Sequence, residues 1–153
     1  MEFTPYSMLL TNPNVLWIEK EKVMEKSKRF IDGLKKLSEV DDLAGQEVIA
    51  SLSGLTEDVG KYIVEFAFGE IYQRKGLSLK QREMITISCL LAQGGTESQL
   101  EVHINGSLNV GLTEKEIIET FIQAIPYVGF PRVLNAIKVA KLVFKHRVSN
   151  SET

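Results

Sequence analysis

Residues 77–131 read LSLKQREMITISCLLAQGGTESQLEVHINGSLNVGLTEKEIIETFIQAIPYVGFP, and this stretch decides the fold. Apolar side chains recur in it every three or four residues, which is the spacing of a helix and not of a strand. The pair Gly94-Gly95 interrupts the first apolar run, and Gly111 interrupts the second. The stretch therefore predicts two helices joined by a short turn and followed by a third helix.

The three helices share a local start signal. A hydroxyl residue is followed three positions later by Gln or Glu, the pattern of a capping box that satisfies free backbone donors. The pairs are Ser78 with Gln81, Thr96 with Gln99, and Thr113 with Glu116. The expected helix ends are marked by Gly94, Gly111 and Pro126.

The rest of the chain also favours helices, so the predicted class is all-α, with six or seven helices. Further helices are expected over residues 17–37, over 45–53 up to Gly54, from Thr56 to Gly76, and from Pro131 through Phe144. Residues 1–16 contain two prolines and predict an extended N-terminal arm. Residues 17–148 are expected to form one domain, since 153 residues suit a single core.

Composition excludes several classes of function. The net charge is −2, so no basic surface indicates nucleic-acid binding. No window approaches 18 uncharged apolar residues, so no membrane span is expected. Cys89 is the only cysteine, which rules out an internal disulfide, argues against a cysteine zinc site and suits a cytoplasmic location. We expect Cys89 to be buried in the middle of a helix.

His103 is the best candidate for acid–base chemistry, because an imidazole titrates near neutral pH. Thr96, Gln99 and His103 lie near one helix face, beside an apolar stripe. Gly106 is small and leaves room for a ligand or a close helix. An antiparallel helix pair would bring Glu83 toward His103. The alternative reading is a histidine at the core edge that bonds a backbone carbonyl.

Several segments together resemble the carboxymuconolactone decarboxylase family over roughly residues 45–145. They are Glu65 to Tyr72, Gly76-Leu77-Ser78, Arg82-Glu83, Gln99-Leu100, His103 to Gly106, Gly111-Leu112-Thr113, Glu116 to Glu119, and Tyr127 to Pro131. The resemblance implies an AhpD-like helical fold that assembles into rings, commonly homohexamers built from trimers or dimers. It also implies a small-molecule active site that contains neither a cofactor nor a metal.

The resemblance covers two branches with different chemistry. The alkylhydroperoxidase branch uses a Cys-x-x-Cys pair, and its positions fall on Thr96 and Gln99, which cannot form a disulfide. The decarboxylase branch acts on 4-carboxymuconolactone in aromatic compound degradation and needs no thiol. On that branch the resemblance implies His103 as the proton donor and Glu83 as its partner.

The decarboxylase reading also predicts residues that contact the substrate. Arg82 would bind a carboxylate and Tyr127 would donate to an oxyanion, while Thr96 and Gln99 would line the site. Capping accounts for Thr96 and Gln99 equally well, and helix packing accounts for Tyr127, as it does for Phe66, Phe68 and Tyr72. The function expected is cofactor-independent decarboxylation of a small lactone or carboxylate. The alternatives are an alkylhydroperoxidase-like peroxidase and a non-catalytic oligomer that binds small molecules.

Overall fold

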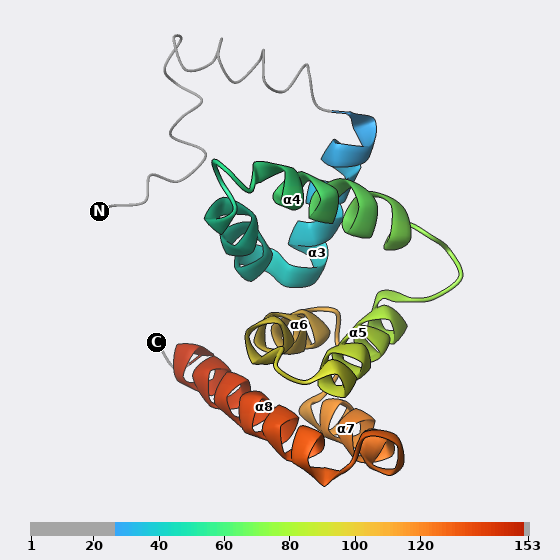
Figure 1. Cartoon of the computed structure of the whole chain (residues 1–153), viewed down its shortest axis with the longest axis vertical. Helices are drawn as coiled ribbons and strands as arrows, with labels where there is room; N and C mark the ends of the chain where they lie inside the picture. The colour runs from blue at the N-terminus through green and yellow to red at the C-terminus, as the bar shows by residue number, and fades with distance from the viewer. Residues whose placement is uncertain (1–26, 152–153) are drawn as a thin grey trace.

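The computed structural model describes residues 27–151, and every regular element in this range is a helix. The predicted all-α class is confirmed for this part of the chain. The predicted arm, residues 1–16, and residues 17–26 of the predicted first helix lie outside the described residues. In chain order the elements are α3 (Lys28–Ser51), α4 (Glu57–Tyr62), the π-helix η1 (Ile63–Ile71), α5 (Leu79–Gln93), α6 (Glu97–Asn109), α7 (Glu114–Val128) and α8 (Phe130–Ser151) (Figure 1).

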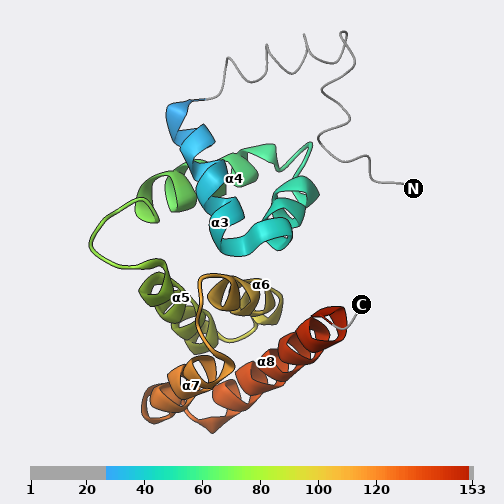
Figure 2. The ribbon, with the colours of Figure 1, turned by 180° about the vertical axis from the view of Figure 1, so that it is seen from behind.

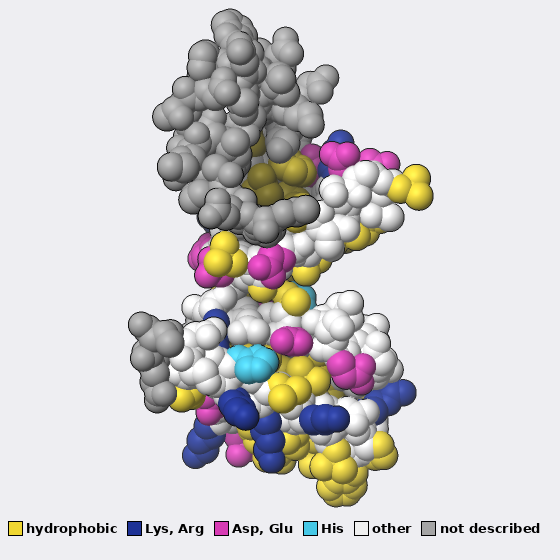
Figure 3. All heavy atoms as spheres, turned by 90° about the vertical axis from the view of Figure 1, so that its left-hand side faces the viewer, with side chains coloured by type: hydrophobic (Ala, Val, Ile, Leu, Met, Phe, Trp, Pro, Cys, Tyr) yellow, Lys and Arg dark blue, Asp and Glu magenta, His cyan; other side chains and the backbone are white. Residues whose placement is uncertain are grey.

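The helices form two groups, and α6 lies between them (Figures 1 and 2). In the first group, α3 packs along η1 over a core of Leu37, Val40, Val64 and Phe68. In the second, α5, α7 and α8 surround α6 over a larger core that includes Ile87, Ile104 and Phe121. Viewed from the side, the molecule narrows between the groups, and on the face shown several Lys and Arg side chains lie over the second group (Figure 3). The contact of α3 with α6 joins the two groups.

The backbones of α3 and η1 touch where the two helices cross. A Cβ atom at Gly33 would lie 2.1 Å from the carbonyl oxygen of Val64, and one at Gly69 would lie 2.5 Å from the carbonyl oxygen of Arg29. Both distances are far below van der Waals contact, so only glycine permits this approach. The crossing therefore depends on both glycines.

A kink at Asp42 divides α3. Its φ of 49° and ψ of −131° are not helical, and Asp42 is the only residue other than glycine with positive φ in the described range. The predicted end of the first helix at residue 37 was wrong, because the helix continues to this kink and resumes up to Ser51. The amide Nδ2 of Asn109 donates to the carbonyl of Val40 at 3.0 Å, and Arg147 bonds the side chain of Asn109. The second group thus supports the backbone next to the kink.

Two of the three predicted capping boxes are confirmed, at Ser78 and at Thr113. The third was wrong: the hydroxyl of Thr96 donates to the carbonyl of Leu90 at 2.8 Å and makes no cap. With φ −121° and ψ 29°, Thr96 does not adopt the extended backbone that turns a capping hydroxyl toward the helix.

The predicted helix end at Pro126 was also wrong. Helix α7 contains Pro126 and continues to Val128, and Gly129 with φ 80° ends it. A proline removes one backbone donor but does not force a helix to stop. Helix α8 begins at Phe130, one residue before the predicted start. None of the helices in residues 27–151 is long and apolar enough to cross a membrane.

Candidate active site

A cavity of about 460 Å³ lies between the two helix groups. Its volume is in the range of pockets that hold small molecules. Much of the wall is apolar, from α3, η1 and α6: Leu37, Val48, Ile49, Ile63, Phe68 and Val102. The polar and ionisable groups in the wall are few: Asp41, Tyr72, Thr86, Ser98, Gln99 and His103.

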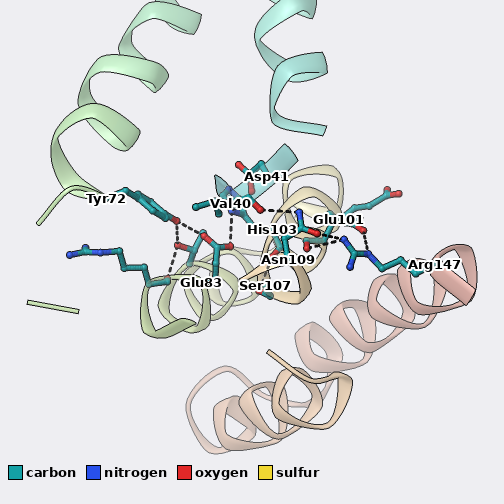
Figure 4. Close-up of polar contacts among 12 residues, drawn as sticks. Val40, Asp41, Tyr72, Glu83, Glu101, His103, Ser107, Asn109 and Arg147 are labelled. Carbon is teal, nitrogen blue, oxygen red and sulfur yellow. Dashed lines mark hydrogen bonds and ion pairs between the residues drawn. The ribbon is translucent and has the colours of Figure 1, made fainter. Parts of the chain in front are cut away.

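Glu83 of α5 and His103 of α6 meet beside this cavity (Figure 4). The distance from Nδ1 of His103 to Oε2 of Glu83 is 3.1 Å, which is a hydrogen bond. Glu83 is completely buried, whereas the His103 side chain keeps 22% of its surface exposed. The prediction that an antiparallel helix pair would bring Glu83 toward His103 is confirmed as geometry.

Tyr72 fixes the other oxygen of Glu83. The Tyr72 hydroxyl donates to Oε1 of Glu83 at 2.6 Å and lies 3.1 Å from the hydroxyl of Thr86. Its ring stacks on Phe68 with 4.8 Å between the ring centres. Burial, together with the charge of Glu83, raises the pKa of Tyr72, so the hydroxyl remains a donor. The π-helix η1 ends just before Tyr72, and such helices are frequent at functional sites.

Asp41 is a third ionisable residue at the site, and the sequence analysis missed it. It comes from α3, immediately before the kink, and is only 3% exposed. Its Oδ1 lies 3.9 Å from Nδ1 of His103 and has no hydrogen-bond partner among residues 27–151. A Cβ atom at position 106 would lie 2.5 Å from this oxygen, so Gly106 makes the space that Asp41 occupies. That glycine was the one signal in the sequence.

The environment shifts the pKa of both Asp41 and His103 upward. For Asp41, burial raises the pKa from 3.8 to about 7, with Glu83 adding to the rise and His103 opposing it. For His103, burial favours the neutral ring, but the hydrogen bond and the charges of Glu83 and Asp41 outweigh it and raise the pKa above 6.5. The imidazole therefore holds its proton at a higher pH than a free histidine does.

Of the predicted substrate contacts, only Gln99 lines this cavity. The guanidinium of Arg82 donates to the carbonyl of Arg74 at 2.6 Å and lies 6.0 Å from the centre of the Tyr72 ring. Thr96 bonds the end of α5, as described above. The side chains of Arg82 and Thr96 thus bond backbone carbonyls of this chain, and neither residue lines the cavity.

Tyr127 lies on a different surface. It is 80% exposed and lines a separate hollow of about 810 Å³ between α5 and α7. Cys89 lines the same hollow and is exposed, so the expectation that it would be buried was wrong. Phe68 and Tyr72 line the cavity at His103, while Phe66 is 60% exposed. The expectation of a packing stripe therefore does not hold for Phe66.

Asp41, Glu83 and His103 also carry atoms that metal ions favour, all within 4.8 Å of one another. In this arrangement Nδ1 of His103 and Oε2 of Glu83 bond each other at 3.1 Å. The arrangement thus lets His103 and Glu83 share a proton, while the carboxyl of Asp41 lies close to both without a hydrogen bond from Oδ1 to any described residue.

The chain is similar in sequence to known proteins. Residues 57–142 match the carboxymuconolactone decarboxylase family. The chain is similar to the 4-carboxymuconolactone decarboxylase of Acinetobacter baylyi, at 34% identity over 80% of this chain and 91% of that protein. It is also similar to the nitrosuccinic acid decarboxylase of Metarhizium robertsii, at 30% identity over 80% of this chain and 86% of that protein.

Proposed function

The chain belongs to the carboxymuconolactone decarboxylase family and to the carboxy-lyases, and from this premise we propose that it removes CO2 from a small lactone or carboxylate without a cofactor. The observation that carries the proposal is the hydrogen bond of 3.1 Å between His103 and Glu83 at the wall of a cavity. In this proposal His103 is the proton donor and Glu83 is its partner.

The names of the two relatives indicate what kind of substrate suits this chemistry. One name contains a carboxyl group and a lactone, and the other an acid and a nitro group. A lactone carbonyl and a nitro group can each accept an electron pair onto oxygen. We propose a substrate of this class, a carboxylate next to such an acceptor, because the acceptor then takes the electrons that a cofactor would otherwise hold.

The proposed reaction breaks one carbon–carbon bond and forms one carbon–hydrogen bond. The carboxylate leaves as CO2, and the electron pair of the broken bond moves into the acceptor group of the substrate. His103 then delivers a proton to carbon as a general acid. Its Nδ1 is bonded to Glu83, so Nε2 is the nitrogen left to deliver the proton. Solvent returns the proton, and Gln99 offers a polar contact at the cavity wall.

Glu83 has a separate task in this scheme. It stabilises the imidazolium, which raises the pKa of His103 and favours the protonated form of the acid. The bond from Tyr72 holds the carboxylate in place at 2.6 Å. A peroxidase reaction has less support, since the only cysteine lies on the other hollow.

His103→Gln tests the proposal, because the amide keeps polarity but cannot act as an acid at neutral pH. We expect turnover of 4-carboxymuconolactone or nitrosuccinic acid to fall by about 10²- to 10⁴-fold. His146→Gln is the matched control, since His146 is exposed on α8. Circular dichroism should show unchanged helicity for both variants. Equal activity of the His103 variant and the wild type would remove His103 from the chemistry.

We further propose that the protein is cytoplasmic and forms a ring-shaped homo-oligomer. Support for the assembly comes from large apolar side chains on α7 and α8: Tyr127 is 80% exposed, Phe130 65% and Leu134 61%. Light scattering after gel filtration measures the mass in solution. A single-chain mass at micromolar concentration would contradict the oligomer without affecting the proposed reaction.

A further inference from the structure

In the described part of the chain, the Asp41 carboxyl has a buried oxygen without a hydrogen-bond partner. Both oxygens of Glu83 are engaged, one by Tyr72 and the other by His103. Asp41 lines the cavity, and its Oδ1 is buried and makes no hydrogen bond within the described residues. A buried polar atom left unpaired costs stability. A ligand in the cavity that Asp41 lines could accept a hydrogen bond from this carboxyl and offset that cost.

The charges at the site indicate which form of Asp41 suits an anionic substrate. No Lys or Arg lines this cavity in the part of the chain that the structure describes. An ionised Asp41 and Glu83 would together outweigh the single positive charge of His103 and repel a carboxylate. A neutral Asp41 removes that excess and gives the site an O–H donor.

We propose that Asp41 is a further catalytic residue, a neutral acid whose carboxyl donates a hydrogen bond to the substrate oxygen that receives the electron pair when CO2 leaves. This inference rests on the proposed decarboxylation. Asp41 and His103 both line the cavity, so one small molecule in it can contact both residues. The proton of Asp41 is not transferred; the hydrogen bond stabilises the oxyanion.

The fold holds Asp41 in this position from several sides. The kink at Asp42 follows it directly, and the bond from Asn109 fixes the carbonyl of Val40 before it (Figure 4).

The titratable groups that face Asp41 are Glu83 from α5, His103 from α6 and Tyr72 at the end of η1. Arg147 of α8 bonds Asn105 and Asn109 of α6. Burial raises the pKa of Asp41 to about 7, in agreement with a neutral carboxyl below that pH.

The first test asks whether Asp41 is protonated, with no need for turnover. Infrared spectra of the wild type and of Asp41→Asn, both at about pH 6, are subtracted. We expect a carboxylic-acid carbonyl band in the wild type that the variant lacks. A difference spectrum without that band would overturn the proposal.

The second test measures turnover of 4-carboxymuconolactone and nitrosuccinic acid by the wild type, Asp41→Asn and Asp41→Ala. Asp41→Asn keeps a neutral donor and should lower kcat about tenfold, whereas Asp41→Ala should lower kcat by about 10²- to 10³-fold with little change in KM. Circular dichroism confirms that both variants are folded.

Equal kcat values for the two variants, or an Asp41→Ala variant within about threefold of the wild type, would overturn the role. A wild type that shows the infrared band but decarboxylates neither acid would refute the proposed function and would still support a neutral Asp41.

Discussion

Replacing Asp41 by Asn should change how the stability of the protein depends on pH. The pKa of Asp41 rises from 3.8 to about 7 on folding because the carboxyl is buried. A raised pKa means that the stabilisation is complete below pH 3.8 and is lost as the pH rises toward 7. Each pH unit between these values corresponds to about 1.4 kcal/mol, so the total loss is about 4 kcal/mol.

Asp41→Asn does not titrate and should not show this loss. Between about pH 4 and about pH 8, the free energy of unfolding of the variant should therefore gain about 4 kcal/mol relative to that of the wild type. Any cost of the amide itself is the same at every pH and cancels from this comparison. The raised pKa of His103 acts in the same direction in the wild type, and it weakens in the variant when the charge of Asp41 is removed.

Urea denaturation followed by circular dichroism at both pH values measures the effect. Asp58→Asn is the matched control, because Asp58 is exposed on α4, and its effect should stay within about 0.5 kcal/mol. A difference between wild type and Asp41→Asn that is the same at both pH values would refute the reasoning. A variant whose stability relative to the wild type falls as the pH rises would refute it as well.

Three further substitutions test the surroundings of the site. Gly106→Ala places a Cβ atom 2.5 Å from Oδ1 of Asp41, and it should cost about 1–3 kcal/mol in urea denaturation and reduce decarboxylation; normal stability would contradict the close contact. Tyr72→Phe removes the hydrogen bond to Glu83 and should lower the free energy of unfolding by about 1–3 kcal/mol. NMR titration should also show a lower pKa of His103, which checks that Tyr72 acts on the site through Glu83. Ser78→Ala removes a capping box away from the cavity and should cost about 1 kcal/mol while kcat stays unchanged; a loss of turnover would count against a purely local role.

Helical periodicity was sufficient to predict the class and most elements, because burial of one helix face dominates the pattern of apolar residues. It did not predict that η1 is a π-helix, since the apolar spacing over nine residues differs little between the two helix types. It also placed a break near residue 37, whereas the kink lies at Asp42. An aspartate with positive φ has no distinct sequence signal, because many aspartates have ordinary backbone angles.

The part of the site that a short turn brings together was predictable. Glu83 and His103 lie on helices joined by Gly94-Gly95, so their approach follows from an antiparallel pair. Asp41 was missed because it comes from another helix group, 62 positions before His103, and no local pattern encodes that contact. Tyr127, predicted as a substrate contact, lines the other hollow, because closeness in sequence to the motif does not determine which surface a side chain reaches.

The crossing of Gly33 and Gly69 has a consequence for how a molecule enters. Two backbones in direct contact have no side chains that slide past one another, so residues 28–41 and η1 should move as one rigid pair. A molecule would then enter the cavity by movement of the part of α3 after the kink, residues 43–51, which contributes Val48 and Ile49 to the cavity wall. Amide hydrogen exchange should therefore be slow in α3 before the kink at Asp42 and fast in residues 43–51 after it.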